Sequence, residues 1–344
     1  SFFMFFYLLN IFLFFALIKK YLSNKLLFIF LALSPTLIMF SFNDLGGYQR
    51  LDVLSIAAIL IHALISQKYY EKKIDLNFYQ KILFYFIFPF IFISILFHEI
   101  QLFSLPFHFF VTWNILKDNF FSIIKRYLIF LIPIYLVFFI YPDPESIILM
   151  EKNIGERGIY SSALLFHTKN IGLVHYLHEI NINILNINNL KMHLLMILLA
   201  TTPFILILLY FNKLNLLISD NEINYKFIFF VTFPFLAGLL IGDFGRWINI
   251  MSFTAFGYMS QFPLKFKLND FKLFNDEIYK FIVNFILLSL TIFYLFFIRI
   301  PHCCNLEKLN INLYGGIVNK GISIINVLFN SEEGGLYDLD ARFK

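Results

Sequence analysis

The sequence predicts an all-α fold, a polytopic bundle of about ten transmembrane helices, and three observations support this prediction. Hydrophobic residues make up 60% of the 344-residue chain and charged residues only 14%, with a mean hydropathy of +0.76. Soluble domains have about 45–50% apolar and about 25% charged residues, so the composition excludes an ordinary soluble domain. Apolar segments of near-spanning length recur along the chain, and Lys and Arg collect in alternate connections between them.

Nine apolar segments and a weaker tenth define the predicted helices. The nine segments are residues 1–18, 26–42, 51–67, 82–98, 102–116, 127–141, 193–211, 227–242 and 281–298. The tenth, 248–263, is weaker because four polar residues interrupt it, and the segment at 102–116 is interrupted by a proline, a histidine and an asparagine. Several segments are shorter than the roughly 20 residues of a typical span, so the predicted boundaries are approximate.

The distribution of Lys and Arg orients the predicted bundle, because these residues concentrate in cytoplasmic connections of membrane proteins. Alternate connections form one face, at residues 19–25, 68–81, 117–126, 212–226 and 264–280. This face has sixteen of the 27 Lys and Arg residues and eight acidic residues, a net charge of +8, which leaves −3 of the total of +5 to the other face. We therefore expect the basic face to be cytoplasmic and the chain to start outside.

Two regions are predicted along the chain. Residues 1–298 form the transmembrane bundle, with one long outer connection at 142–192, and residues 299–344 form an outer interfacial and polar tail. Within the long connection, apolar residues at helical spacing in 167–180 predict a helix that lies in the membrane interface. No internal repeat and no inverted pair of broken helices is evident.

The first candidate site is the stretch GDFGRW at residues 242–247, on the predicted outer face. Asp243 and Arg246 are three residues apart and can pair on a helical turn. An arginine suits bidentate capture of phosphate, and a neighbouring carboxylate could orient a hydroxyl nucleophile. The alternative is a structural ion pair at a helix end, with Trp247 in the aromatic belt at the membrane surface.

The second candidate is the pair His98 and Glu99, where one apolar segment ends and the next begins. Ionisable residues at such a place are costly unless they face a cavity or the interface. A histidine beside a glutamate can act as a general base with its orienting partner. The alternative is a polar cap where the helix leaves the membrane.

Two further outer stretches combine acids and bases. NDLGGYQRLD, residues 43–52, contains Asp44, Arg50 and Asp52, and the long connection contains Arg157 next to an acid. Each could bind an anionic substrate, and each could equally be an ordinary extracellular turn.

Other polar residues favour structural interpretations. His175 in the long connection shares a helical face with His178 and Glu179, a spacing that could bind zinc, but an interfacial helix explains it equally well. His62 is alone in its apolar segment and predicts a buried interhelical hydrogen bond. We expect no metal and no cofactor. The basic residues form no patch, which excludes nucleic-acid binding.

The architecture, with GDFGRWINI and FHEIQ on its outer face, resembles bacterial polysaccharide polymerases of the O-antigen and capsule type. It is more distantly similar to the glycosyltransferases of the C superfamily, which use lipid-linked sugars. The resemblance implies a location in the bacterial inner membrane and a polyprenyl-diphosphate-linked glycan as substrate, handled at the periplasmic or extracellular face.

The resemblance also assigns roles to individual residues. Arg246, with Arg50 or Arg157, would hold the diphosphate leaving group. Glu99 with His98, or Asp243, would be the general base. Asp44 and Trp247 would complete the substrate-binding surface.

Two other functions remain open at this stage. A transporter or flippase for a lipid-linked or anionic solute would need ionisable groups near the middle of the membrane, whereas most charges here lie at segment ends. A non-catalytic subunit of an envelope complex would use the outer motifs to contact membrane-protein partners. In every case membrane lipid surrounds the bundle.

Overall fold

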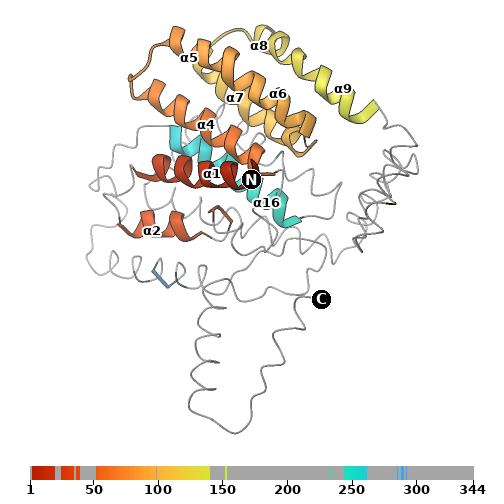
Figure 1. Ribbon diagram of the computed structural model, residues 1–344. Coiled ribbons are helices and arrows are strands. Elements are labelled where there is room, and N and C mark those ends of the chain that lie inside the picture. Colours follow the sequence, from red (N-terminus) through yellow and green to blue (C-terminus); the bar gives the residue numbers. More distant parts are fainter. Residues whose placement is uncertain are drawn as a thin grey trace, which may run out of the picture.

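The computed structural model describes a helical bundle built mainly from the N-terminal part of the chain. The described residues are 2–19, 25–34, 36–38, 52–97, 99–139 and 244–261, with single positions at 152, 233, 285, 288, 289 and 292. Every regular element among them is a helix, which confirms an all-α fold for this part of the chain. Figure 1 shows these helices stacked as roughly layered rods.

The elements follow the chain in a simple order. The helices are α1 (Phe2–Ile18), α2 (Lys25–Leu33), α4 (Asp52–Tyr70), α5 (Leu76–Ile82), η3 (Leu83–Ile87), α6 (Phe88–Phe97), η4 (Glu99–Ser104), α7 (Leu105–Leu116), α8 (Phe120–Tyr127), η5 (Leu128–Phe130), α9 (Leu131–Phe139) and α16 (Phe244–Gln261). Segments α5, η3 and α6 follow one another without a break, as do α8, η5 and α9.

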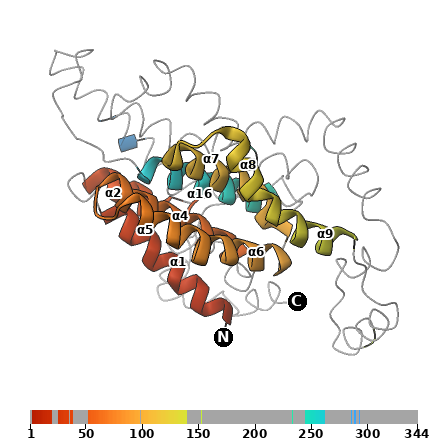
Figure 2. The same ribbon diagram turned by 90° about the horizontal axis from the view of Figure 1, so that it is seen from above.

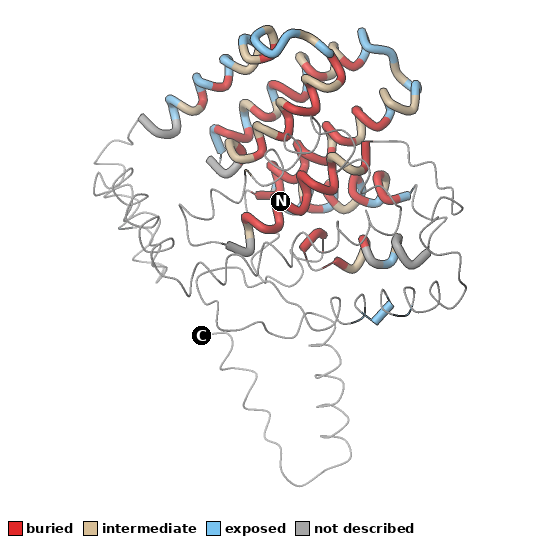
Figure 3. Tube along the Cα trace, turned by 180° about the vertical axis from the view of Figure 1, so that it is seen from behind, coloured by how far each residue is buried: buried red, intermediate tan, exposed pale blue. Residues whose placement is uncertain are grey.

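Helix α4 lies at the centre of the bundle. Thirteen of its 19 residues are buried. Its main neighbours are α1 and α16, and α6, α7 and η4 also pack against it (Figures 1 and 2). Small residues, among them Ala57, Ala58 and Ala63, let neighbouring helices approach closely. Buried residues fill the middle of the bundle, whereas α8 and α9 are largely exposed along one side (Figure 3).

Local sequence explains where several helices begin. Asp75 caps α5, since its Oδ1 accepts a hydrogen bond of 2.7 Å from the Phe78 backbone N–H. The helix therefore starts six residues before the predicted segment at 82–98. The predicted segment at 102–116 is divided into η4 and α7, and Pro106 lies in the first turn of α7, where a missing N–H costs nothing. Asn119 caps α8 in the same way as Asp75 caps α5.

Helix α16 is the segment that the sequence predicted most weakly, yet it is one of the principal neighbours of α4. The four polar residues that weakened the prediction are all buried: Ser252, Thr254, Ser260 and Gln261. Two of the hydroxyls are satisfied within the helix, because Thr254 Oγ1 donates to Met251 O at 2.8 Å and Ser260 Oγ donates to Gly257 O at 3.0 Å. Such internal bonds let hydroxyl residues pack in an apolar interior.

Two of the described helical stretches are long and apolar enough to cross a membrane, Asp52–Tyr70 and Leu76–Phe97. Helix α2 is shorter than the predicted segment at 26–42. Apart from single positions, the predicted segments at 193–211, 227–242 and 281–298, the connection 142–192 and the tail 299–344 lie outside the described residues. The count of ten spanning helices therefore stays a prediction.

Gly257 lies where three helices pack closely at the centre of the bundle. A Cβ atom there would meet Ile59 Cγ2 and Phe107 Cζ, each at 3.1 Å, so α16, α4 and α7 meet at this point. We expect Gly257→Leu to lower the free energy of unfolding by about 1–3 kcal/mol through overpacking. Gly257→Ala should have a smaller effect. Thermal unfolding in detergent measures both effects.

The control at an exposed position, Tyr85→Leu (82% exposed), should leave the unfolding transition unchanged. Equal stability of Gly257→Leu and the wild type would contradict this packing.

Candidate functional site

An ion pair joins the starts of two helices that are far apart in sequence. Arg246 Nε donates to Asp52 Oδ2 at 2.6 Å, and Arg246 Nη2 donates to Asp52 Oδ1 at 2.7 Å. The two side chains are only 15% and 11% exposed. Two parallel N–H···O bonds to one carboxylate are the strongest form of such a pair. Asp52 also begins α4, where a negative charge suits the helix dipole.

Other polar contacts gather around this end of the bundle. Asn10 Nδ2 donates to Val53 O at 2.8 Å, which ties α1 to the start of α4. Asn249 Nδ2 donates to the carbonyl oxygens of Thr36 and Leu37 at 2.8 and 3.1 Å. The segment that follows α2 is therefore held against α16. Buried amide side chains thus bond backbone carbonyls both at the start of α4 and in the segment after α2.

Trp247 follows Arg246 and packs into the same end. Its ring meets the Phe103 ring of η4 edge to face, with centroids 5.0 Å apart, and the residue is 2% exposed. Its Nε1 has no hydrogen-bond partner within the described part of the chain. Trp247 therefore packs inside the bundle here, whereas an aromatic-belt position would expose it at the membrane surface. Because Trp247 directly follows Arg246, the contact also brings η4 to the end of the bundle that holds the ion pair.

The structure describes only some of the predicted site residues. Arg246 and Trp247 are described as above, and η4 begins at Glu99. The side chain of Glu99 falls outside the described set. Five other predicted site residues fall outside it entirely: Asp44, Arg50, His98, Arg157 and Asp243. Arg246 pairs with Asp52, which belongs to a different predicted outer motif, NDLGGYQRLD. The pairing of Arg246 with Asp243 stays a prediction. A separation of 194 residues gave no local signal for this contact.

A second polar cluster lies in the middle of the bundle. His62 Nδ1 is 2.9 Å from His108 Nδ1, and His62 Nε2 is 2.8 Å from the Tyr79 hydroxyl. The two imidazole rings are stacked, with centroids 5.2 Å apart and an interplanar angle of 5°. All three residues are fully buried. The predicted interhelical hydrogen bonding of His62 is therefore present, and it connects α4 to both α5 and α7.

The cluster has two consistent hydrogen-bonding directions. A neutral imidazole has one donor and one acceptor nitrogen, so one histidine must donate across the Nδ1 to Nδ1 contact. When His108 donates to His62, His62 Nε2–H donates to Tyr79. When His62 donates to His108, the Tyr79 hydroxyl donates to His62 Nε2. These three residues can therefore reverse the direction of the hydrogen bonds between them by moving protons alone.

Further polar side chains continue the cluster on both sides. Gln101 Nε2 is 3.4 Å from His108 Nε2 and donates to Ser104 Oγ at 2.6 Å. Gln101 Oε1 has no partner among the described residues, and turning the amide over would present this oxygen to His108. On the other side, Thr112 Oγ1 lies 3.0 Å from the Tyr127 hydroxyl and links α7 to α8.

The cluster has no signature along the sequence, because His62, Tyr79 and His108 come from different helices. His108 was treated only as an interruption of the segment 102–116, yet it is fully buried against His62. The available signal was that both histidines lie inside apolar segments, where an ionisable side chain needs a partner. Pairing them, however, required the packing of α4 against α7.

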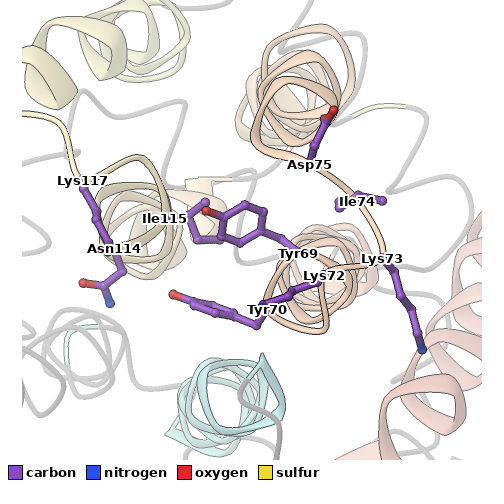
Figure 4. A pocket seen from close by; sticks show the side chains of 9 residues that line it. All are labelled: Tyr69, Tyr70, Lys72, Lys73, Ile74, Asp75, Asn114, Ile115 and Lys117. Atoms are coloured by element: carbon purple, nitrogen blue, oxygen red, sulfur yellow. The ribbon is translucent and has the colours of Figure 1, made fainter.

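A pocket of about 550 Å³ opens at the other end of α4. Its lining comes from the α4–α5 turn and the end of α7: Tyr69, Tyr70, Lys72, Lys73, Ile74, Asp75, Asn114, Ile115 and Lys117 (Figure 4). The distribution of Lys and Arg predicted that the connections 68–81 and 117–126 lie on the same face. Residues of both connections do line this one pocket. No candidate site was predicted in either connection. In the described part of the chain, no group of three or more His, Cys, Asp or Glu residues is arranged to hold a metal ion.

No family model, curated protein or solved structure matches this chain. The geometry of the described residues comprises a buried ion pair at one end of α4, a histidine and tyrosine cluster at its middle and a basic pocket at its other end.

Because His62 and His108 contact each other, we expect their substitutions to have coupled effects on the free energy of unfolding. His62→Leu or His108→Leu alone should lower the free energy of unfolding, because each leaves the other imidazole without its buried partner. The double variant should lose less than the sum of the two, with a coupling energy of about 0.5–2 kcal/mol, the range seen for hydrogen bonds inside membrane proteins. A double-mutant cycle by thermal or denaturant unfolding measures this energy. Strictly additive losses would show that the two rings do not interact.

Proposed function

We propose that this chain is a polytopic protein of the bacterial inner membrane with about ten spanning helices, and that it is a polysaccharide polymerase or glycosyltransferase. Its substrate would be a polyprenyl-diphosphate-linked sugar handled at the outer face. The observation that carries the proposal is the Asp52–Arg246 pair, which joins two of the predicted outer motifs at one end of the bundle. The contact between Trp247 and η4 brings the FHEIQ region to the same end.

The charge of the opposite end supports the proposed orientation. The turn after α4 and the end of α7 have Lys72, Lys73 and Lys117, and they lie at the far end of α4 from Asp52. Lysines near helix ends favour the cytoplasmic side. The Asp52–Arg246 end would then face outward, where a polymerase of this type receives its lipid-linked substrate.

The proposed chemistry needs a cation and a base within one substrate length. In glycosyl transfer the bond from the anomeric carbon to the diphosphate oxygen breaks, and a bond to the acceptor oxygen forms. Negative charge develops on the leaving diphosphate, and an arginine stabilises it. Asp52 would hold the guanidinium of Arg246 in a fixed plane toward that charge. The acceptor hydroxyl would lose its proton to Glu99 with His98, or to Asp243.

Replacing the pair as a unit tests the proposal. Removing one partner alone would leave a buried charge and could unfold the protein, so the variant is Asp52→Asn with Arg246→Gln. We expect at least a tenfold weaker affinity for polyprenyl diphosphate in nanodiscs, because a hydrogen bond to a charged group is worth about 1.5–3 kcal/mol. In cells we expect loss of long glycan chains.

A matched pair at the other end supplies the control. Arg126 Nη2 donates to Asp118 Oδ2 at 2.6 Å, and this pair is about one-third exposed. Asp118→Asn with Arg126→Gln should keep both the affinity and the glycan length. Unchanged polyprenyl-diphosphate binding and glycan length in a folded Asp52→Asn, Arg246→Gln variant would reject the glycosyltransferase proposal.

A second candidate function, proton-coupled transport of an anionic or lipid-linked solute, is favoured by the histidine cluster. A proton that binds His108 Nε2 would allow His108 Nδ1–H to pass to His62 Nδ1. The proton on His62 Nε2 would then pass to the Tyr79 oxygen, and the original Tyr79 proton would pass toward the Thr112 hydroxyl, the next polar group of the cluster. Chains of this kind, buried among spanning helices, are typical of proton pathways.

Proton entry into proteoliposomes tests this alternative. With an imposed membrane potential and an internal pH dye, the wild type should acidify the lumen faster than protein-free liposomes do. His62→Gln and His108→Gln should reduce the rate to the protein-free level, because an amide does not relay a proton in this way. Ser94→Ala is the control, since Ser94 Oγ bonds only its own helix at Phe90 O among the contacts described. A wild type no faster than protein-free liposomes would exclude the proton pathway.

A further inference from the structure

We propose that the pocket between the ends of α4 and α7 binds the phosphate group of an anionic ligand. This site lies at the opposite end of α4 from the Asp52–Arg246 pair, and it serves neither the glycosyl transfer nor the proton pathway proposed above. The pocket volume of about 550 Å³ falls within the range of ligand sites, about 300–1,000 Å³. A phosphate with its ester group would fit within this space.

The charges around the pocket leave two lysines available. Lys73 Nζ is paired with Glu71 Oε2 at 2.6 Å, and the Asp75 carboxylate accepts the Phe78 backbone N–H. Lys72 and Lys117 have no carboxylate partner among the described residues. Lys72 lines the pocket from the α4 side and Lys117 from the α7 side (Figure 4), so a phosphate bound in it would be attracted by positive charge from both helices.

The backbone at the two lysines gives an independent indication. Lys72 and Lys117 are the only non-glycine residues with positive φ in the described part of the chain, at 57° and 54°. Glycine or asparagine usually occupies this left-handed conformation after a helix. A lysine adopts it at an energetic cost, and residues under such strain concentrate at functional sites. Both strained positions line the same pocket, which suggests that the ammonium groups are needed there.

Neutral donors complete the pocket. Figure 4 shows the phenol groups of Tyr69 and Tyr70 pointing across from α4 toward the side of Asn114 and Ile115, whereas Lys73 extends away from them. Phenol and amide groups donate hydrogen bonds to phosphate oxygens. Positive charge with several neutral donors favours a phosphate ester over an apolar ligand.

Two sources could supply this phosphate group. If the bundle spans a membrane as proposed, the ends of α4 and α7 lie at the level of the lipid headgroups, and basic pockets between helices on the cytoplasmic side bind anionic headgroups. A soluble phosphate monoester from the aqueous phase has the same recognition chemistry. The experiment therefore uses one probe for each source: phosphatidylglycerol, with phosphatidylcholine as the zwitterionic comparison, and glycerol 3-phosphate.

The test variant is the full chain with Lys72→Gly and Lys117→Gly. Glycine suits the left-handed backbone, so this variant should unfold at the same or a higher temperature than the wild type without ligand. It should also bind the ligand at least tenfold more weakly, because both ammonium groups are gone. A loss of binding without a loss of stability separates a ligand site from a structural role. Lys68→Gln, at the same end but not lining the pocket, is the control.

Binding is measured in detergent by native mass spectrometry and by the shift in unfolding temperature. Retention of phosphatidylglycerol over phosphatidylcholine by the wild type, lost in the double variant, supports the site with a lipid headgroup. Stabilisation by glycerol 3-phosphate, lost in the double variant, supports the site with a soluble ester. Equal responses of the wild type and the double variant to both probes would overturn the proposal, whatever the outcome at the outer end.

Discussion

The pairing of polar side chains on a buried helix is the constraint on which this structure depends. Helix α4 is enclosed by α1, α16, α6 and α7, so its polar groups have little access to solvent and must find partners on other helices. Asp52 finds Arg246 of α16, and His62 finds His108 of α7 and Tyr79 of α5. Apolar packing allows many arrangements of helices, whereas these directional contacts select one register for each neighbour.

The same contacts divide α4 into three chemically different levels. One end holds a largely buried ion pair, the middle holds a fully buried histidine and tyrosine cluster, and the other end opens into a basic pocket. Each level joins a different set of elements, because the neighbours of α4 approach it at different heights. One rigid helix therefore connects the proposed outer site with the proposed phosphate site.

Sequence patterns predicted the helices well where local signals are strong. The segments at 1–18 and 51–67 became α1 and α4, with ends within three residues of the predictions. Errors arose where a cap or a proline set the boundary, as at Asp75 and Pro106. The candidate site was anticipated only in part. Arg246 was singled out, but its partner Asp52 was expected to act with its own motif, because contacts across 194 residues have no signature along the chain.

The sequence by itself determined the helical, strongly apolar character of the protein, because composition and apolar segment length depend only on the order of residues. It also predicted which connections are basic. The tertiary structure alone decided which polar residues meet. His108 and the polar residues of α16 looked like interruptions of apolar segments, yet all of them are buried. His108 is hydrogen-bonded to His62 of α4, and Thr254 and Ser260 are hydrogen-bonded within their own helix. The physical reason is that the environment of a polar side chain is set by neighbouring helices, and these come from distant parts of the chain.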